Sequence, residues 1–277
     1  MAGRASRRTG SPLRSCLRAT IYVAPIAQKI PSEPVVLVTG GLSGIGEAAA
    51  VAFGRLGARL VLVDRATDRG DDVVAAVRAA GGDAVVAQAD VRDHEQLADA
   101  AKLAVDRFGR IDALLANAGI SDQSSAAGGD PERWRAVVET NLLGTIYAVR
   151  AVLPQMLRQS SGHIFVTSSV SGREAYPGEA VYIASKWGQV GYAHALRQEV
   201  ADAGIRVTVV EPGIVDTPLT RDNPLVRPLL DATEPLNPAD VAEALVYGFR
   251  QPPHVVVSEL TVRPLHQQAP RFDQTTT

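Results

Sequence analysis

The stretch Thr39-Gly40-Gly41-Leu42-Ser43-Gly44-Ile45-Gly46 follows an apolar run, Val35 to Val38, and precedes an alanine-rich segment. This pattern predicts a tight turn from a buried β-strand into an α-helix. Gly40 would allow the sharp turn, Gly44 would let the backbone approach a pyrophosphate group, and Gly46 would let helix and strand pack closely. The first N–H groups of the helix would bind the phosphates. Turns that bind no ligand also use glycine, so the stretch alone fits a dinucleotide site or a structural turn.

From Pro34 onward, short apolar segments alternate with alanine-rich segments of helical character. Buried strands joined by helices indicate a parallel sheet with right-handed crossovers. We therefore predict an α/β fold, a doubly wound (Rossmann-like) parallel sheet with helices on both faces, in a single domain over residues 34–265. The expected strands are Val35–Thr39, Arg59–Val63, Ala84–Gln88, Ala113–Ala116, His163–Ser168, Arg206–Glu211 and Val255–Val257. The expected helices lie near 45–56, 68–80, 94–108, 131–158, 182–203 and 238–250.

The two ends of the chain differ from this domain. Residues 1–33 are rich in arginine and contain no acidic residue before Glu33. We interpret them as a disordered basic extension, with a transit peptide as the alternative. Residues 266–277 are interpreted as a polar C-terminal tail.

Composition limits the functions that the chain can have. The 277 residues carry a net charge of −2, which argues against nucleic acid as the main partner. The apolar runs are too short to span a bilayer, so no membrane partner is expected and a cytoplasmic location is predicted. The one cysteine, Cys16, excludes an internal disulfide, and the histidines show no paired spacing. No metal site is expected.

Tyr182 and Lys186 lie four residues apart, which places both side chains on one face of a helix. A tyrosine with a pKa near 10 is a poor base at neutral pH, and burial makes it poorer, whereas a nearby ammonium group makes it better. The pair is therefore typical of a proton-transferring tyrosine. Upstream, the strand that ends at Ser168-Ser169 would bring a hydroxyl to the edge of the sheet where ligands bind, although a serine-rich segment is also typical of a simple loop.

The chain from about Val35 to Pro264 resembles the short-chain dehydrogenase/reductase family, in its single-domain branch. The motifs that carry the resemblance are TGxxxGxG at Thr39–Gly46, Asp90, NAG at Asn117–Gly119, a helix asparagine at Asn141, Ser169 ahead of YxxxK at Tyr182–Lys186, and PGxxxT at Pro212–Thr217. The C-terminal segment lacks the DGG common in the family and is similar to a branch of broad substrate range. The segment Pro218–Pro235 would cover the substrate.

The resemblance implies an oxidoreductase that transfers a hydride between a nicotinamide cofactor and a secondary alcohol, ketone or aldehyde. Tyr182 would be the acid–base group, Ser169 would position the substrate oxygen, Lys186 would lower the tyrosine pKa and Asn141 would hold a relay water. A non-catalytic NAD(P)-sensing protein on the same fold is the alternative. A homodimer or homotetramer is expected. The implied cofactor-binding residues are Gly40, Ser43, Gly44, Ile45, Gly46, Asp64, Arg65, Asp90, Val91, Asn117, Ala118, Gly119, Tyr182, Lys186, Pro212, Gly213, Ile214 and Thr217.

Asp64, at the end of the second predicted strand, bears on which nicotinamide cofactor is used. Its carboxylate could accept hydrogen bonds from the adenosine ribose and repel a 2′-phosphate, although a helix N-cap is the structural alternative. Ser43 also favours NAD, because NADP-dependent members of the family often carry Arg or Lys at this position of the loop. Arg65 favours NADP, because it lies where such members often carry a basic residue. We predict NAD over NADP.

Overall fold

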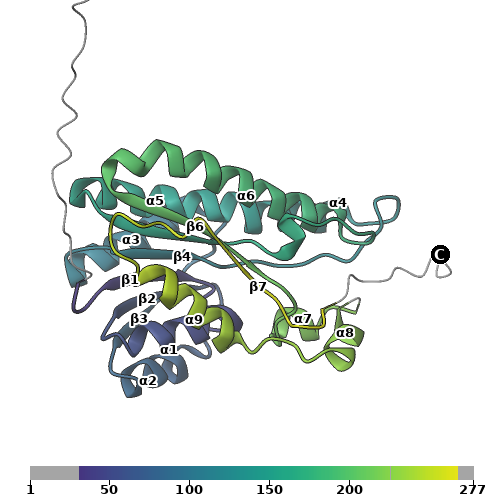
Figure 1. The fold of residues 1–277 in the computed structure, drawn as a ribbon, viewed down its shortest axis with the longest axis horizontal. Coiled ribbons are helices and arrows are strands. Elements are labelled where there is room, and N and C mark those ends of the chain that lie inside the picture. The colour runs from purple at the N-terminus through teal and green to yellow at the C-terminus, as the bar shows by residue number, and fades with distance from the viewer. Residues whose placement is uncertain (1–30, 225, 268–277) are drawn as a thin grey trace, which may run out of the picture.

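A parallel β-sheet forms the centre of the molecule (Figure 1). The computed structural model describes residues 31–224 and 226–267, and within them seven strands pair in the order β3-β2-β1-β4-β5-β6-β7. The strands are β1 Val35–Thr39, β2 Arg59–Asp64, β3 Asp83–Gln88, β4 Ala113–Ala116, β5 Gly162–Thr167, β6 Ile205–Pro212 and β7 Glu259–Val262. The predicted doubly wound α/β fold is confirmed. The strand order reverses between β1 and β4, where the open end of such a sheet binds ligands.

Helices cover both faces of the sheet. Along β1, Val35 and Leu37 pack on the side of α3, α5 and α6, while Val36 and Val38 pack on the side of α1, α2 and α9. This alternation explains why the strand is apolar at each position from Val35 to Val38. The helices are α1 Gly44–Gly54, α2 Gly70–Ala79, α3 His94–Phe108, α4 Pro131–Val138, α5 Gly144–Gln159, α6 Ala180–Val200, α7 Pro218–Arg221, α8 Arg227–Ala232 and α9 Pro238–Phe249.

The single helix predicted over 131–158 is interrupted. A π-helical turn, Glu139–Leu143, separates α4 from α5, and π-turns of this kind often occur at functional sites. Among the described residues, the combined run Pro131–Gln159 is the one helix with the length and apolar composition of a membrane span, and 39% of its most apolar window is buried. Val149, Val152 and Met156 of α5 belong to the core between the sheet and helices α3, α5 and α6.

The last predicted strand was wrong in position. Val255–Val257 forms no strand, and β7 runs over Glu259–Val262 instead. The cause lies in the neighbouring strand β6, where the side chains of Arg206 and Thr208 donate hydrogen bonds to the carbonyl oxygens of Val255 and Val257 at 3.4 and 2.7 Å. Those carbonyls are thereby engaged by side chains rather than by a strand ladder, and backbone pairing begins only at Ser258.

Two further predictions concern segments outside the sheet. The expected cover over residues 218–235 contains two short helices, α7 and α8. The predicted basic extension lies almost wholly outside the described residues, as does most of the predicted C-terminal tail.

Candidate active site

The glycine loop between β1 and α1 has the geometry that the sequence predicted. Gly40 and Gly44 have positive φ angles of 65° and 52°, which side-chain-bearing residues rarely adopt. A Cβ atom on Gly46 would lie 1.9 Å from the carbonyl oxygen of Gly40, so only glycine allows this approach of helix to loop. In the described structure, Ser43 makes no side-chain cap to α1. The first N–H groups of this helix therefore remain available to a phosphate.

A side-chain clamp holds the loop against β4. The amide of Asn117 donates hydrogen bonds to the carbonyl oxygens of Thr39 and Gly40, both at 3.2 Å. In return, the Thr39 hydroxyl accepts from the N–H groups of Asn117 and Ala118 at 3.0 and 3.2 Å. Asn117 thus links the glycine loop to the end of β4. Thr39, which the sequence analysis did not single out, completes the clamp.

Asp64 and Arg65 lie at the end of β2, beside the glycine loop. One carboxylate oxygen of Asp64 accepts from the Leu42 N–H at 3.4 Å, and the other accepts from the Arg65 N–H at 2.8 Å. Arg69 was missed by the sequence analysis. Its guanidinium donates to the Leu42 carbonyl oxygen at 3.1 Å and pairs with Glu47. Its place directly before α2, whose first turn is acidic, gave no signal of contact with the loop.

Asp90 and Val91, two of the residues that the resemblance implies for cofactor binding, follow β3. Three hydrogen bonds from the Arg92 guanidinium hold the Asp90 carboxylate and lower the pKa of that group. Val91 is buried against Gly144, where a Cβ atom would come within 2.8 Å of the valine methyl group. Asp90 is therefore oriented by an ion pair, and Val91 packs against the start of α5.

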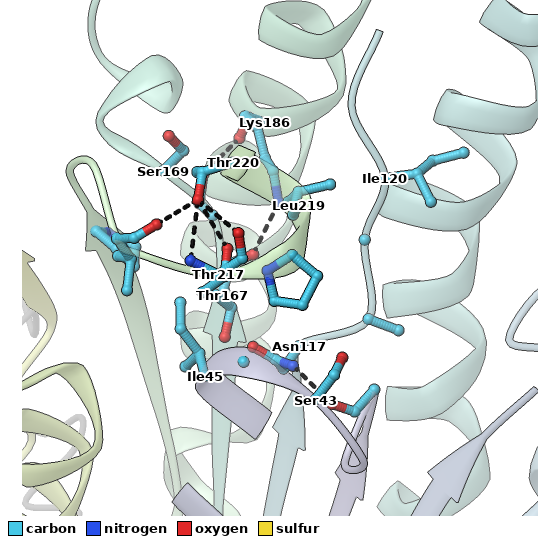
Figure 2. A pocket seen from close by; sticks show the side chains of 18 of the residues that line it. Ser43, Ile45, Asn117, Ile120, Thr167, Ser169, Lys186, Thr217, Leu219 and Thr220 are labelled. Carbon is cyan, nitrogen blue, oxygen red and sulfur yellow. Dashed lines mark hydrogen bonds between the residues drawn. The ribbon is translucent and has the colours of Figure 1, made fainter. Parts of the chain in front are cut away.

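A cleft of about 170 Å³ opens at the carboxyl ends of the strands. Figure 2 shows side chains of the glycine loop, the end of β4 and helix α6 converging on it. The predicted residues that line it are Gly40, Ser43, Gly44, Ile45, Asn117, Ala118, Gly119, Ser169, Tyr182, Lys186, Pro212, Gly213 and Thr217. The predicted residues Gly46, Asp64, Arg65, Asp90, Val91, Asn141 and Ile214 do not line it.

Tyr182, Lys186 and Ser169 meet inside this cleft. Lys186 is buried on the same face of α6 as Tyr182; its Nζ donates to the Thr167 carbonyl oxygen at 3.1 Å and lies 5.5 Å from the Tyr182 ring centre. The Ser169 hydroxyl forms a hydrogen bond with Tyr182 and also accepts from the Ser171 N–H at 3.1 Å. The Thr167 contact uses a backbone oxygen, so no side-chain pattern could reveal it.

Burial dominates the electrostatics of the pair. It raises the pKa of Tyr182 above the usual range, and the nearby carboxylate of Glu179 raises it further, while the bond from Ser169 lowers it. Burial also lowers the pKa of Lys186 to about 7. Because Ser169 is the group that lowers the tyrosine pKa here, the expected tuning of Tyr182 by Lys186 stays a prediction.

Asn141 lies in the π-helical turn and is fully buried. Its amide oxygen accepts from the Ile120 N–H at 2.8 Å, and its amide nitrogen donates to the Ile120 carbonyl oxygen at 2.9 Å and the Ser185 hydroxyl at 3.0 Å. Its backbone oxygen accepts from Gln189 at 2.8 Å. These contacts tie the strand-end loop to α6. The relay role implied for Asn141 stays a prediction.

The segment after β6 closes the opposite side of the cleft. The Ile214 N–H donates to the side-chain oxygen of Gln267 at 3.0 Å, and Ile214 lines an adjoining cavity. Thr217 is the N-cap of α7 and forms a capping box with Thr220. Among the residues that the structure describes, no group of three or more His, Cys, Asp or Glu side chains is placed to hold a metal ion.

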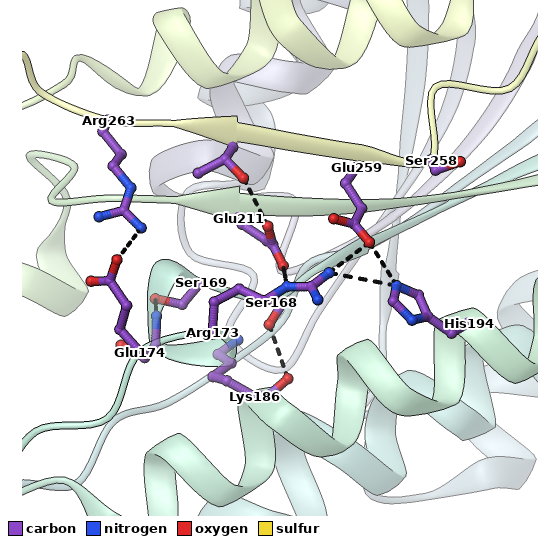
Figure 3. Close-up of polar contacts among 12 residues, drawn as sticks. Ser168, Ser169, Arg173, Glu174, Lys186, His194, Glu211, Ser258, Glu259 and Arg263 are labelled. Carbon is purple, nitrogen blue, oxygen red and sulfur yellow. Dashed lines mark hydrogen bonds and ion pairs between the residues drawn. The ribbon is translucent and has the colours of Figure 1, made fainter.

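The turn that carries Ser169 is anchored by an ion-pair network (Figure 3). Arg173, at the end of that turn, donates to Glu211 of β6 at 2.6 Å and pairs with Glu259 of β7 at 2.7 Å. Glu259 also contacts His194 of α6 at 2.8 Å. The network therefore joins the turn, the neighbouring strands β6 and β7, and α6.

The comparison with known families agrees with this geometry. The sequence model described as short chain dehydrogenase matches residues 34–225. This chain belongs to the short-chain dehydrogenase family. An oxidoreductase of Staphylococcus saprophyticus is 39% identical over 235 residues, covering 84% of this chain and 98% of the relative. An oxidoreductase of Listeria innocua is 35% identical over 240 residues, covering 84% and 97%. The protein is an oxidoreductase of this family.

Solved structures of family members have the same fold. An alcohol dehydrogenase from the archaeon Thermococcus sibiricus, complexed with 5-hydroxy-NADP, superposes with a TM-score of 0.77 at 28% identity and covers 86% of this chain and 100% of its own. Levodione reductase gives a TM-score of 0.76 at 30% identity, with coverage of 83% and 95%. A metagenomic short-chain oxidoreductase in complex with NADP gives 0.73 at 30%, with coverage of 84% and 98%.

Proposed function

We propose that this protein transfers a hydride between a nicotinamide cofactor and a secondary alcohol or its ketone, with Tyr182 as the acid–base group. The observation that carries the proposal is the convergence of Tyr182, Ser169 and Lys186 on a cleft that is continuous with the glycine loop. The alcohol dehydrogenase and levodione reductase among the solved relatives support the same reaction class.

The residues of the cleft fit a dinucleotide. Gly44 has its α-carbon against Thr217, where a Cβ would come within 3.1 Å of the threonine methyl group, so the backbone there leaves no room for a side chain. The open N-terminus of α1 would hold the pyrophosphate, and Asn117 to Gly119 would support the cofactor beside β4. When bound, the nicotinamide ring would accept or supply the hydride.

The side chains of the site would handle the proton. In the direction of reduction, the Tyr182 hydroxyl would donate its proton to the substrate oxygen, while the Ser169 hydroxyl donates a hydrogen bond to the same oxygen. In the direction of oxidation, the tyrosine oxygen would take the alcohol proton. Lys186, held by the Thr167 carbonyl oxygen, would supply positive charge beside the phenolate.

Tyr182→Phe tests the proposal because only the hydroxyl is removed. We expect turnover of alcohols and ketones, followed by cofactor absorbance, to fall by at least a hundredfold, a typical effect of losing a general acid–base. Cofactor binding and the melting temperature should stay within experimental error. Tyr247→Phe, which removes the hydroxyl of an exposed tyrosine on α9, is the matched control and should keep full activity. More than a few per cent residual activity in Tyr182→Phe would reject the assignment.

We infer further that the cofactor is NAD rather than NADP. The Asp64 carboxylate lies beside the glycine loop, where it would accept hydrogen bonds from ribose hydroxyls and repel a 2′-phosphate. Repulsion between close charges costs about 1 kcal/mol in water and several in a cleft, which corresponds to tenfold or greater discrimination. Arg65 is adjacent and exposed, and NADP-type ligands occur in two of the solved relatives, so NADP is the alternative.

The ratio of kcat/KM for the two cofactors decides between them. A preference for NAD that Asp64→Ala abolishes would support the assignment. A preference for NADP that survives Asp64→Ala and is lost in Arg65→Ala would assign control to Arg65.

A further inference from the structure

A second cavity, of about 80 Å³, adjoins the catalytic cleft and shares Ser169 and Tyr182 with it. If the reacting oxygen lies between these two hydroxyl groups, as the proposed function requires, the rest of the substrate must extend into this space. The cavity is the region that determines which alcohols fit. Its polar side chains include Ser121, Ser171, Tyr176, Glu179 and Asn223, and its apolar ones include Val170, Leu219, Val226 and Leu229.

Glu179 stands out among these residues. It is 5% exposed, and one of its carboxylate oxygens accepts a hydrogen bond from Asn223 at 3.1 Å. Within the part of the chain that the structure describes, no cationic side chain forms an ion pair with it. Asp122 adds a second negative charge nearby, and burial raises the pKa of Glu179. A buried carboxylate without a cation carries a large desolvation cost, which further hydrogen-bond donors would offset.

The helix that follows does not supply those donors. Glu179 occupies the N-cap position of α6, but in the described structure its side chain makes no capping hydrogen bond to the helix. Glu179 instead lines the cavity together with Tyr182, three residues further along the chain, and lies close enough for its charge to raise the tyrosine pKa. A substrate whose alcohol oxygen meets Tyr182 and whose remaining atoms fill this cavity would therefore extend toward Glu179.

We propose that Glu179 binds a second hydrogen-bond donor on the substrate, a hydroxyl or ammonium group, and so makes the enzyme selective for small diols or amino alcohols over hydrocarbon alcohols of the same size. This inference rests on the proposed function and names its substrate class. It follows from a buried acceptor that lines the substrate cavity and that, among the residues the structure describes, accepts one side-chain hydrogen bond, whereas a carboxylate can accept several.

Three isosteric substrates test the proposal: 2-pentanol, 1,3-butanediol and 4-amino-2-butanol. They share the reacting carbinol and differ only in a terminal methyl, hydroxyl or ammonium group. For the wild-type enzyme we expect kcat/KM for at least one donor-bearing substrate to exceed that for 2-pentanol by tenfold or more. Whichever of the two donor-bearing substrates has the higher kcat/KM identifies the group, hydroxyl or ammonium, that the site prefers.

Glu179→Gln removes the charge while keeping an oxygen that can accept from Asn223. Because Glu179 also raises the Tyr182 pKa, the variant will alter the chemical step for every substrate, so the ratio between substrates is the informative quantity. We expect that ratio to fall at least tenfold. Asp202→Asn, which removes an exposed carboxylate at the far end of α6, is the matched control and should leave the ratio unchanged.

The possible failures are distinguishable. Equal kcat/KM for all three substrates, or an unchanged ratio in Glu179→Gln, would overturn the role of Glu179 and leave the proposed function intact. An equal loss on all three substrates is one form of the unchanged ratio: it would show that Glu179 acts on Tyr182 or holds the Asn223 segment without binding the substrate, and would overturn the proposal. If none of the three is turned over with either cofactor, while other secondary alcohols or ketones are, the substrate class proposed for Glu179 is overturned. If no alcohol or ketone is turned over with either cofactor, the proposed function itself is contradicted.

Discussion

Replacing Arg173 with methionine should destabilise the fold, because it leaves the buried carboxylate of Glu211 without its cationic partner (Figure 3). Glu211 is only 1% exposed; it is bound by Arg173 at 2.6 Å, and its second oxygen accepts from the Thr261 hydroxyl at 2.8 Å. Removing one partner of a buried ion pair costs about 3–5 kcal/mol. The Arg173 side chain is itself 36% exposed, so water can reach part of the vacated space. We therefore expect a loss of about 2–3 kcal/mol in unfolding free energy, which lowers the melting temperature by about 5–10 °C for a domain of this size.

Urea unfolding of a double-mutant cycle isolates the pair: wild type, Arg173→Met, Glu211→Gln and the double variant. The double variant should recover most of the loss, because no buried charge is left unpaired. Arg263→Met is a close control, since Arg263 is also 36% exposed but its partner Glu174 is 48% exposed, and it should cost less than about 1 kcal/mol. A coupling energy below about 0.5 kcal/mol between Arg173 and Glu211, or equal losses in Arg173→Met and Arg263→Met, would refute the reasoning.

Three further predictions follow from single side chains. Lys186→Met should lower kcat at least a hundredfold and also weaken cofactor binding in a fluorescence titration; normal rates with an unchanged pH profile would remove Lys186 from the mechanism. Burial holds the pKa of His163 well below its usual value, so the unfolded chain takes up a proton first as the pH falls below about 6.5, and stability should drop by up to about 1.4 kcal/mol per pH unit. His163→Gln should flatten that dependence in thermal melts, whereas His254→Gln, at an exposed position, should not. Trp187, 50% exposed on α6, should lie in a homodimer or homotetramer contact; a monomer in light scattering at micromolar concentration would contradict this.

The order of strands and helices was predictable because it depends on the local spacing of apolar residues and on the glycine-rich turn from Gly40 to Gly46. The last strand was not. Val255–Val257 is more β-branched than the segment that pairs, but Arg206 and Thr208 engage its carbonyl oxygens, and that contact spans more than 40 residues of sequence. The π-helical turn at Asn141 was hidden for the same reason, because its amide is fixed by Ile120, 21 residues away.

Within the site, the residues of the loop motifs could be placed from the sequence because each of those motifs adjoins the end of a strand, and parallel strands bring their carboxyl ends together. The directions in which the pKa values of the site residues shift could not be predicted in the same way. A spacing of four residues indicates that Tyr182 and Lys186 are neighbours, but not that burial lowers the lysine pKa to about 7. Glu179 gave no signal either, since a glutamate at the start of a helix is usually exposed and stabilised by the helix dipole.

The buried groups around Tyr182 link substrate recognition to the chemical step. Glu179 and burial both raise the tyrosine pKa, so at neutral pH the hydroxyl is held protonated, ready to donate to a ketone and poorly able to accept a proton from an alcohol. A donor group on the substrate that binds Glu179 would reduce the effect of this negative charge and lower the tyrosine pKa. An alcohol with such a group should therefore have a higher kcat as well as a lower KM. The increase in kcat should be larger for oxidation than for reduction. A donor-bearing alcohol whose advantage lay wholly in KM would show that Glu179 holds the substrate without influencing the tyrosine.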